Sequence, residues 1–141
     1  MRSILQYFDL ITGVVEHSGA ESAEMEFDEG DQTTGTVDGV VYFYDGSRLE
    51  FTETVTIERR RPIKLFYRYQ YVRAGEGVFR YDNAPHHPDL PNFPHHKHVG
   101  GKKLPATEPT LSQILGEVAA LLGEGVDVLP PVPKRRPRSK R

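Results

Sequence analysis

Apolar residues near the N-terminus recur with the period of a helix. Four of them follow one another at spacings of four, three and four: Ile4, Phe8, Ile11 and Val15. This spacing places the side chains on one stripe of an amphipathic helix. A second helix is predicted over 107–125, with a stop at Gly123 or Gly125. Its apolar face is formed by Leu111, Ile114, Leu115, Val118, Leu121 and Leu122.

Between the two helices the pattern changes to the alternation of half-buried strands. Residues 22–29 alternate apolar and acidic side chains, and 36–58 predict a hairpin around Asp45-Gly46, a dipeptide strongly favoured in tight hairpin turns. Further strands are predicted over 63–72 and 78–82, and 59–62 is predicted to be a loop. The return strand of the hairpin is expected to point inward with Leu49, Phe51, Val55 and Ile57.

The order of these elements defines the fold class. Consecutive strands with short connections form an antiparallel meander, and an apolar sheet face must be covered by helices. We therefore predict an α+β domain over residues 1–126, with a sheet of about five strands flanked by an N-terminal and a C-terminal helix. Residues 127–141 are predicted to form a disordered, proline-rich basic tail.

Composition and charge narrow the classes of function. Cysteine is absent, so disulfides, thiolate zinc sites and cysteine nucleophiles are excluded. No apolar run approaches the ~20 residues of a membrane span. Polar residues interrupt the apolar N-terminus, which argues against a signal peptide. We expect a cytoplasmic protein without membrane contact.

The charge is unevenly divided along the chain. The stretch 134–141 carries six Lys or Arg residues and no acid, whereas the first 133 residues carry all 20 acidic residues and 12 basic ones. The basic arm either meets a polyanion or an acidic partner, or it keeps the protein soluble as a solvated tail.

Tyrosines follow one face of the strand predicted over 63–72. Tyr67, Tyr69 and Tyr71 share that face, and Tyr81 lies on the next strand with Arg80 and Asp82 opposite to it. Tyrosines at a spacing of two either pack as strand-forming bulk or stack nucleic-acid bases beside cations. The sequence leaves both alternatives open.

The most unusual segment is "RYDNAPHHPDLPNFPHHKH", residues 80–98. It contains five of the six histidines, between His86 and His98, and prolines at 85, 88, 91 and 94. Proline fixes φ and removes a backbone donor, so this segment is predicted to be a stiff loop and neither helix nor regular strand. Structural roles in the loop, such as a turn organised by Asp82 and Asn83, account for part of this composition only.

Clustered imidazoles offer two kinds of chemistry. Two histidines with Arg80, Lys97 or Tyr81 would supply the base, acid and cation that metal-free RNA cleavage needs. Alternatively, His96 and His98 at i, i+2, with Asp82 or His86, would suit a divalent ion such as zinc or manganese.

Several quoted stretches together resemble a known family. "VYFYDGSRLEFTETVTIE", "YRYQY" and "FRYDNAPHHPDLPNFPHHKHVG", followed by a leucine-rich acidic helix, resemble the TumE family from about Tyr7 to Leu122. This family comprises small bacterial and archaeal proteins described as the toxin component of a two-gene toxin–antitoxin system. The resemblance implies a cognate antitoxin partner. RNA cleavage follows from analogy with toxins of similar size and fold.

The candidate residues follow from the motif and its chemistry. The candidate catalytic residues are Arg80, Asp82, His86, His96 and His98. The candidate substrate-binding residues are Tyr69, Tyr71, Tyr81, His87, His95 and Lys97. No cofactor is expected in the metal-free case; the alternative is a zinc or manganese ion on His96, His98 and Asp82.

Three hypotheses of function stand side by side. The first is a toxin that acts on RNA as a small endoribonuclease through the histidine-rich loop. The second is a metal-dependent nuclease or hydrolase, and the third is a non-catalytic binding or regulatory module. The expected partners are the antitoxin and RNA, with a homodimer as a further alternative.

Overall fold

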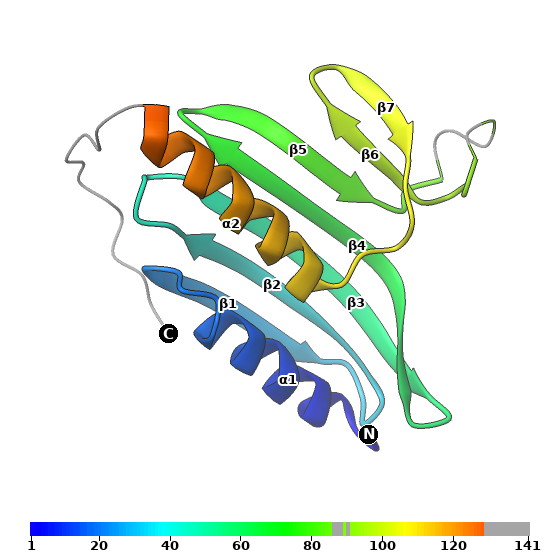
Figure 1. Ribbon diagram of the computed structural model, residues 1–141. Helices are drawn as coiled ribbons and strands as arrows, with labels where there is room; N and C mark the ends of the chain where they lie inside the picture. The colour runs from blue at the N-terminus through cyan, green and yellow to red at the C-terminus, as the bar shows by residue number, and fades with distance from the viewer. Residues whose placement is uncertain (86–88, 90, 129–141) are drawn as a thin grey trace.

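The computed structural model describes residues 1–85, 89 and 91–128, the last six of them by their backbone only (Figure 1). The elements follow in the order α1 (Ile4–Glu16), β1 (Ser22–Glu29), β2 (Thr34–Tyr42), β3 (Arg48–Glu58), β4 (Arg61–Arg73), β5 (Glu76–Asp82), β6 (His96–Val99), β7 (Lys102–Pro105) and α2 (Leu111–Val128).

The strands form one antiparallel sheet in which spatial order equals chain order, β1 to β7. This arrangement confirms the predicted α+β meander flanked by two helices. The described part of the chain contains seven strands where about five were predicted. The additional strands are β6 and β7, which continue the sheet beyond β5.

Both helices begin with the same sequence device. In α1 the hydroxyl of Ser3 accepts from the amide of Gln6, and the Gln6 side chain reaches back to the amide of Ser3. Thr110 and Gln113 make the same reciprocal pair before α2. This capping box satisfies backbone donors that a helix start leaves unpaired. It explains why α2 begins at Leu111 and not at the predicted residue 107.

The two helices lie on one face of the sheet (Figure 1). We call this the helix face. The opposite face, which carries no helix among the described residues, is called the open face; Asp38, Thr52, Arg68 and Asp82 lie side by side on it in the strand register. Cross-strand partners share a face, so every strand divides into an inward and an outward set.

The core lies between the helix face and the helices. The stripe predicted for α1 is buried there, and so are Leu111, Ile114, Leu115 and Val118 of α2. Gly39 of β2 permits the closest contact, because a Cβ at this position would lie 2.4 Å from the ring of Phe51. The aromatic ring therefore lies across the glycine and fills the space of the missing side chain.

Two predicted element boundaries are wrong. Residues 59–62 are not a loop, since Arg59 and Arg60 form a two-residue turn and β4 begins at Arg61. The helix α2 continues through both predicted stops to Val128, two residues beyond the predicted domain end at 126. Of the predicted tail, residues 129–141 lie outside the described part of the chain.

The segment 80–98 is also more regular than predicted. Its two ends are strands, since β5 runs to Asp82 and β6 begins at His96. In the described parts of 83–95, the chain forms neither helix nor strand. Beyond this stretch, β6 pairs with the edge that β5 offers. The loop itself, where described, is confined to 83–95.

Candidate active site on the open face of the sheet

Four of the predicted catalytic residues meet on two neighbouring strands. Arg80 and Asp82 alternate along β5, and His96 and His98 alternate along β6. The register pairs Arg80 with His98 and Asp82 with His96. Since residues two apart and directly opposite share a face, all four side chains lie on the open face.

Asp82 is the centre of this cluster. Its carboxylate lies 2.8 Å from Nε2 of His96, accepts from Nε of Arg80 at 2.9 Å, and accepts from the amide of Ala84 at 3.0 Å. Only 4% of its surface is exposed. A buried carboxylate requires such partners, because an uncompensated charge away from water is strongly unfavourable.

His96 is held at both ring nitrogens. Nδ1 lies 2.9 Å from the carbonyl oxygen of Pro94, so it must carry a proton and donate. Nε2 faces the carboxylate of Asp82 and would oppose it lone pair to lone pair unless a proton or another cation lay between them. His96 is 2% exposed, so it acts from beneath the surface.

His98 has the opposite arrangement. Nη2 of Arg80 lies 3.0 Å from Nε2 of His98, and a guanidinium can only donate. Nε2 of His98 therefore carries a lone pair, and the ring is neutral. Burial lowers the pKa of His98, and the neighbouring Arg80 lowers this pKa further. The rings of His96 and His98 lie 4.8 Å apart. The site thus places a ring that donates from Nδ1, His96, beside a ring that accepts at Nε2, His98.

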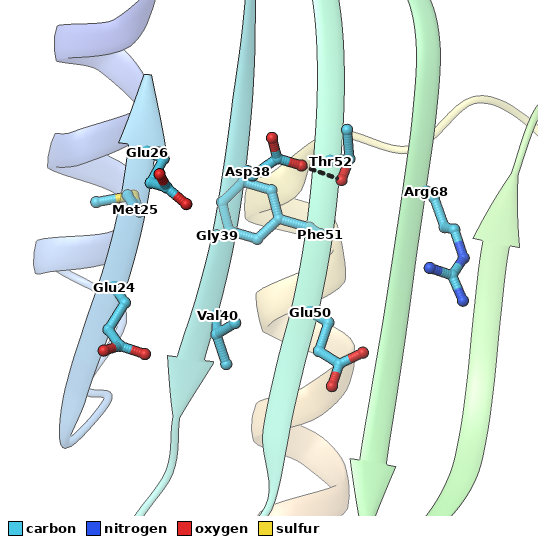
Figure 2. Close-up of a pocket in the computed structure, with 10 residues that line it drawn as sticks. All are labelled: Glu24, Met25, Glu26, Asp38, Gly39, Val40, Glu50, Phe51, Thr52 and Arg68. Carbon is cyan, nitrogen blue, oxygen red and sulfur yellow. Dashed lines mark hydrogen bonds between the residues drawn. The ribbon is translucent and has the colours of Figure 1, made fainter. Parts of the chain in front are cut away.

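The open face is divided electrostatically. Its β1–β3 half carries most of the carboxylates, which line a hollow together with Arg68 at its border (Figure 2). Figure 2 shows Glu24, Glu26, Asp38 and Glu50 on this half, with the helices behind the sheet. On the other half, Arg68 lies directly opposite Asp82, and Lys103 lies opposite His98. The cluster therefore sits on the basic half.

Arg68 was not among the predicted site residues. The alternation of the strand placed it opposite the tyrosines, but only the register shows that it neighbours Asp82. No pattern within β4 indicates this neighbour, because Arg68 and Asp82 are 14 positions apart in the sequence. Arg68 is exposed and extends the basic half towards the centre of the sheet.

Of the predicted substrate-binding residues, those on strands lie on the helix face instead: Tyr69, Tyr71, Tyr81 and Lys97. Tyr81 and Lys97 both contact Glu117 of α2, with the Tyr81 hydroxyl and Lys97 Nζ donating at 2.6 and 2.7 Å. Nδ1 of His95 lies 2.8 Å from the hydroxyl of Tyr67. The sheet separates these three residues from the Asp82 cluster, and the contacts that they make join strands to helix and loop to strand.

Tyr69 and Tyr71 require a correction. Both are 0% exposed in the core beneath the helices, so the structure gives them a packing role and not a base-stacking one. Their hydroxyls bond to Glu53 and Ser47, respectively. His86 and His87 lie outside the described residues.

The cluster also has the composition of a metal site. One ligand atom each from Asp82, His96 and His98 lie within 4.8 Å of one another. The bond from Nδ1 of His96 to a backbone carbonyl is a common outer-shell feature of metal-bound histidines. Zinc or manganese would fit such a donor set. Arg80 occupies this space with its own bonds to Asp82 and His98.

The fold and the site together define a small α+β protein with a polar His–Asp–Arg cluster on the uncovered face of an antiparallel sheet. A family model described as Toxin TumE matches residues 10–122, so the chain belongs to the TumE family. It is the toxin component of a toxin–antitoxin system, which implies an antitoxin partner.

No curated protein and no solved structure matches the chain. Within the described residues, neither helix has the length and apolar character that crossing a bilayer requires.

Proposed function

We propose that this toxin is an endoribonuclease whose active site is the cluster of Arg80, Asp82, His96 and His98, acting on RNA in the cytoplasm. The observation that carries the proposal is that Arg80 donates both to Asp82 and to a neutral His98. A cation and an accepting imidazole at hydrogen-bond distance are the two groups that attack by a ribose 2′-hydroxyl requires.

Binding of a phosphate would activate the base. Arg80 is about one third exposed and can turn its donors towards a phosphate of the RNA. Nε2 of His98 then exchanges its bond from Arg80 for a bond from the adjacent 2′-hydroxyl, whose proton it accepts. In this scheme, binding of the RNA phosphate by Arg80 also makes His98 available as the base.

The reaction is a transesterification within the RNA strand. The 2′-oxygen gives its proton to His98 and forms a bond to phosphorus, while the bond from phosphorus to the 5′-oxygen breaks. The products are a 2′,3′-cyclic phosphate and a 5′-hydroxyl, whose proton comes from water because His96 is too deeply buried to deliver it. Asp82 and His96 are positioning residues that fix Arg80 and His98.

The charge division of the open face favours one half for RNA. Arg68, Arg80 and Lys103 lie on β4, β5 and β7 of the β4–β7 half. The carboxylates of the β1–β3 half would repel phosphate. This arrangement reconciles an acidic body with a polyanionic substrate, since the strand would lie across the basic half only.

The test uses purified toxin, free of antitoxin, with a defined RNA, the same sequence as DNA, and EDTA. The proposal expects RNA cleavage that persists in EDTA, ends in cyclic phosphate and is lost in His98→Ala; the DNA remains intact because it lacks the 2′-hydroxyl. The matched control is His17→Ala, at the C-cap of α1 far from the cluster. Absence of cleavage by the folded protein contradicts the proposal and favours a binding toxin.

A divalent-metal nuclease is the second candidate. It is favoured by the three ligand atoms within 4.8 Å and by the bond of His96 to the carbonyl of Pro94. This chemistry attacks with a metal-activated water and does not need a 2′-hydroxyl. Cleavage of both RNA and DNA that stops in EDTA and returns with zinc or manganese would select it.

A further inference from the structure

The strand β4 is much longer than its neighbour β5. Its residues 61–64, 66 and 67 pair with β3 on one side, with a register shift at Leu65, whereas pairing with β5 begins only at Arg68. Within the described residues, this stretch has no strand on its other side. Figure 1 shows the consequence: the hairpin of β3 and β4 projects beyond the end of β5. Over this stretch, the side of β4 that faces away from β3 is therefore an exposed strand edge, although β4 is a central strand elsewhere.

Three large apolar side chains lie along this edge. Ile63 is 42% exposed, Leu65 55% and Phe66 39%. Single exposed apolar residues are ordinary, but a group of them on an unpaired strand edge invites another chain to pair. Short length and proline usually protect a strand edge from such pairing. This edge is seven residues long, and its one proline, Pro62, lies near the turn.

Asn83 shows how this edge accepts a partner. Its side-chain amide donates to the carbonyl of Leu65 at 3.2 Å, and its side-chain oxygen accepts from the amide of Tyr67 at 3.0 Å. An antiparallel partner exchanges both bonds with one opposite residue, so Asn83 does not copy that ladder but bridges two successive outward-facing residues of the edge. The carbonyl of Leu65 and the amide of Tyr67 therefore face away from β3 and accept hydrogen-bond partners, and Asn83 fills this position at the end of the edge beside Asp82.

The tip of the hairpin carries a concentrated positive charge. Arg59 and Arg60 form the turn and Arg61 follows, all three of them exposed. Arg59 and Arg60 have φ values of 51° and 66°, in the left-handed region that favours Asn and Gly. Each non-glycine residue in this conformation costs roughly 1–2 kcal/mol of conformational free energy. Placing arginine at both positions sacrifices turn stability for charge, which points to a function of that charge.

We propose that the edge of β4 that lacks a neighbouring strand, residues 61–67, is a docking site for the antitoxin. An extended antitoxin segment adds a strand to this edge, packs apolar side chains on Ile63, Leu65 and Phe66, and places acidic side chains at Arg59–Arg61. Strand addition provides main-chain bonds, and the side chains provide specificity. The apolar group favours a peptide over RNA, whose phosphates would be matched by the arginines alone.

The position of the edge also explains how binding would silence the toxin. An added strand would continue the line of β5 and end at Asn83, next to Asp82. It would bring the antitoxin against the basic half of the open face. The inference rests on family membership and holds whether or not the toxin cleaves RNA.

The first experiment measures the affinity of the full-length toxin for the purified protein encoded by the neighbouring antitoxin gene, by calorimetry in a His98→Ala background. Leu65→Glu is compared with Leu5→Glu, a leucine of α1 with nearly the same exposure, 51%. We expect at least a tenfold loss of affinity for the first and less than a twofold change for the second. Backbone amide exchange across 61–67 should slow in the complex.

The second variant tests the charge without disturbing the turn. Arg59→Asn with Arg60→Gly keeps a sequence that prefers the left-handed conformation and removes two cations. We expect weaker antitoxin binding at low salt and a shallower dependence on salt.

Three results would overturn the proposal. The first is an equal loss of antitoxin affinity in Leu65→Glu and Leu5→Glu, and the second is unchanged amide exchange across 61–67 in the complex. The third is a Leu65→Glu variant that loses RNA binding but keeps its affinity for the antitoxin. A homodimer that Leu65→Glu dissolves, with antitoxin binding unchanged, would overturn it too and assign the edge to self-association. None of these readouts depends on cleavage, so failure of the ribonuclease proposal is seen separately.

Discussion

Nη2 of Arg80 donates to Nε2 of His98 at 3.0 Å. This contact keeps the imidazole of His98 neutral but occupied in the absence of substrate. In the proposed reaction, His98 would become available as the base only when Arg80 binds a phosphate of the RNA. The same contact lets the two residues be tested as a unit.

Replacing His98 by alanine should reduce the rate of RNA cleavage by about 10²–10⁴-fold, the usual contribution of a general base. Arg80→Lys keeps the positive charge but loses the fork that holds Asp82 and His98 together, so cleavage should also fall. Initial rates on a short RNA report both effects. His17→Ala, which has no contact with the cluster, should leave the rate unchanged, and a rate of His98→Ala equal to wild type refutes the assignment of the base.

The helices and the first five strands could be predicted from the sequence because their signals are local. The spacing of Ile4, Phe8, Ile11 and Val15 defines α1 without reference to the rest of the chain. The alternation around Asp45-Gly46 likewise predicts the β2–β3 hairpin. Local signals also placed Arg80 and Asp82 on one face.

The rest depends on contacts between distant residues. The strand β6 forms because β5 presents an edge to it, a fact that no pattern within 96–99 contains. Once β6 is a strand, alternation separates His96 and His98 from Lys97, which the sequence alone had grouped together. Glu53 is the clearest case: it lies at an inward position of β3 and is 0% exposed, and its partners Tyr7 and Tyr69 come from other elements.

The buried carboxylate of Glu53 should be important for stability. Tyr7 and Tyr69 donate to it, and Nζ of Lys64 lies 3.8 Å away. Glu53→Gln removes the charge that compensates Lys64, so we expect a loss of about 3 kcal/mol in the free energy of unfolding. Urea unfolding measures it.

The hydroxyl of Tyr7 provides a finer comparison. Tyr7→Phe removes one bond to a buried charge and should cost about 1.5–3 kcal/mol. Tyr42→Phe removes a similar bond to Glu24 on the open face, at 2.9 Å and only half-buried, and should cost about 1 kcal/mol or less. Equal losses for the two phenylalanine variants would show that burial does not strengthen the Tyr7 bond.

The same buried hydroxyls predict an alkaline limit of stability. Burial raises the pKa of Tyr7, Tyr67 and Tyr69, and the carboxylate of Glu53 raises the pKa of Tyr7 and Tyr69 further. The folded state therefore keeps these protons above pH 10, where the unfolded chain loses them. Their contribution is complete below pH 10 and declines as the pH rises above it, by up to about 1.4 kcal/mol per pH unit for each tyrosine.

Lys64 acts with the opposite sign in part of this range. Burial lowers its pKa, so it favours folding as the pH approaches 10.5. Three tyrosines should outweigh one lysine. Unfolding free energies measured between pH 8 and 11.5 should fall above pH 10, and less steeply in Tyr7→Phe. A flat profile would contradict the buried state of these hydroxyls.

Two glycines should respond in opposite directions to the same substitution. Gly39→Ala places a Cβ 2.4 Å from the ring of Phe51, so we expect a loss of about 1–3 kcal/mol from overpacking. Gly116→Ala lies on α2 with no atom within 4 Å of the added Cβ and should gain about 0.5–1 kcal/mol. Thermal unfolding of the two variants measures both signs, and a neutral Gly39→Ala would show that Phe51 can move aside.

Binding of RNA should follow the charge division of the open face. Arg68 borders the basic half directly opposite Asp82, whereas Arg48 lies among the carboxylates and pairs with Glu50 at 2.7 Å. In a His98→Ala background that cannot cleave, Arg68→Gln should weaken binding of a single-stranded RNA. It should also reduce the slope of log K against log salt by about 0.7 if Arg68 contacts one phosphate. Arg48→Gln removes the same charge from the other half. It should change neither the RNA affinity nor the salt slope, because the proposed RNA path does not reach Arg48. If the two variants weaken binding equally, RNA responds only to net charge, and the path across β4–β7 is wrong.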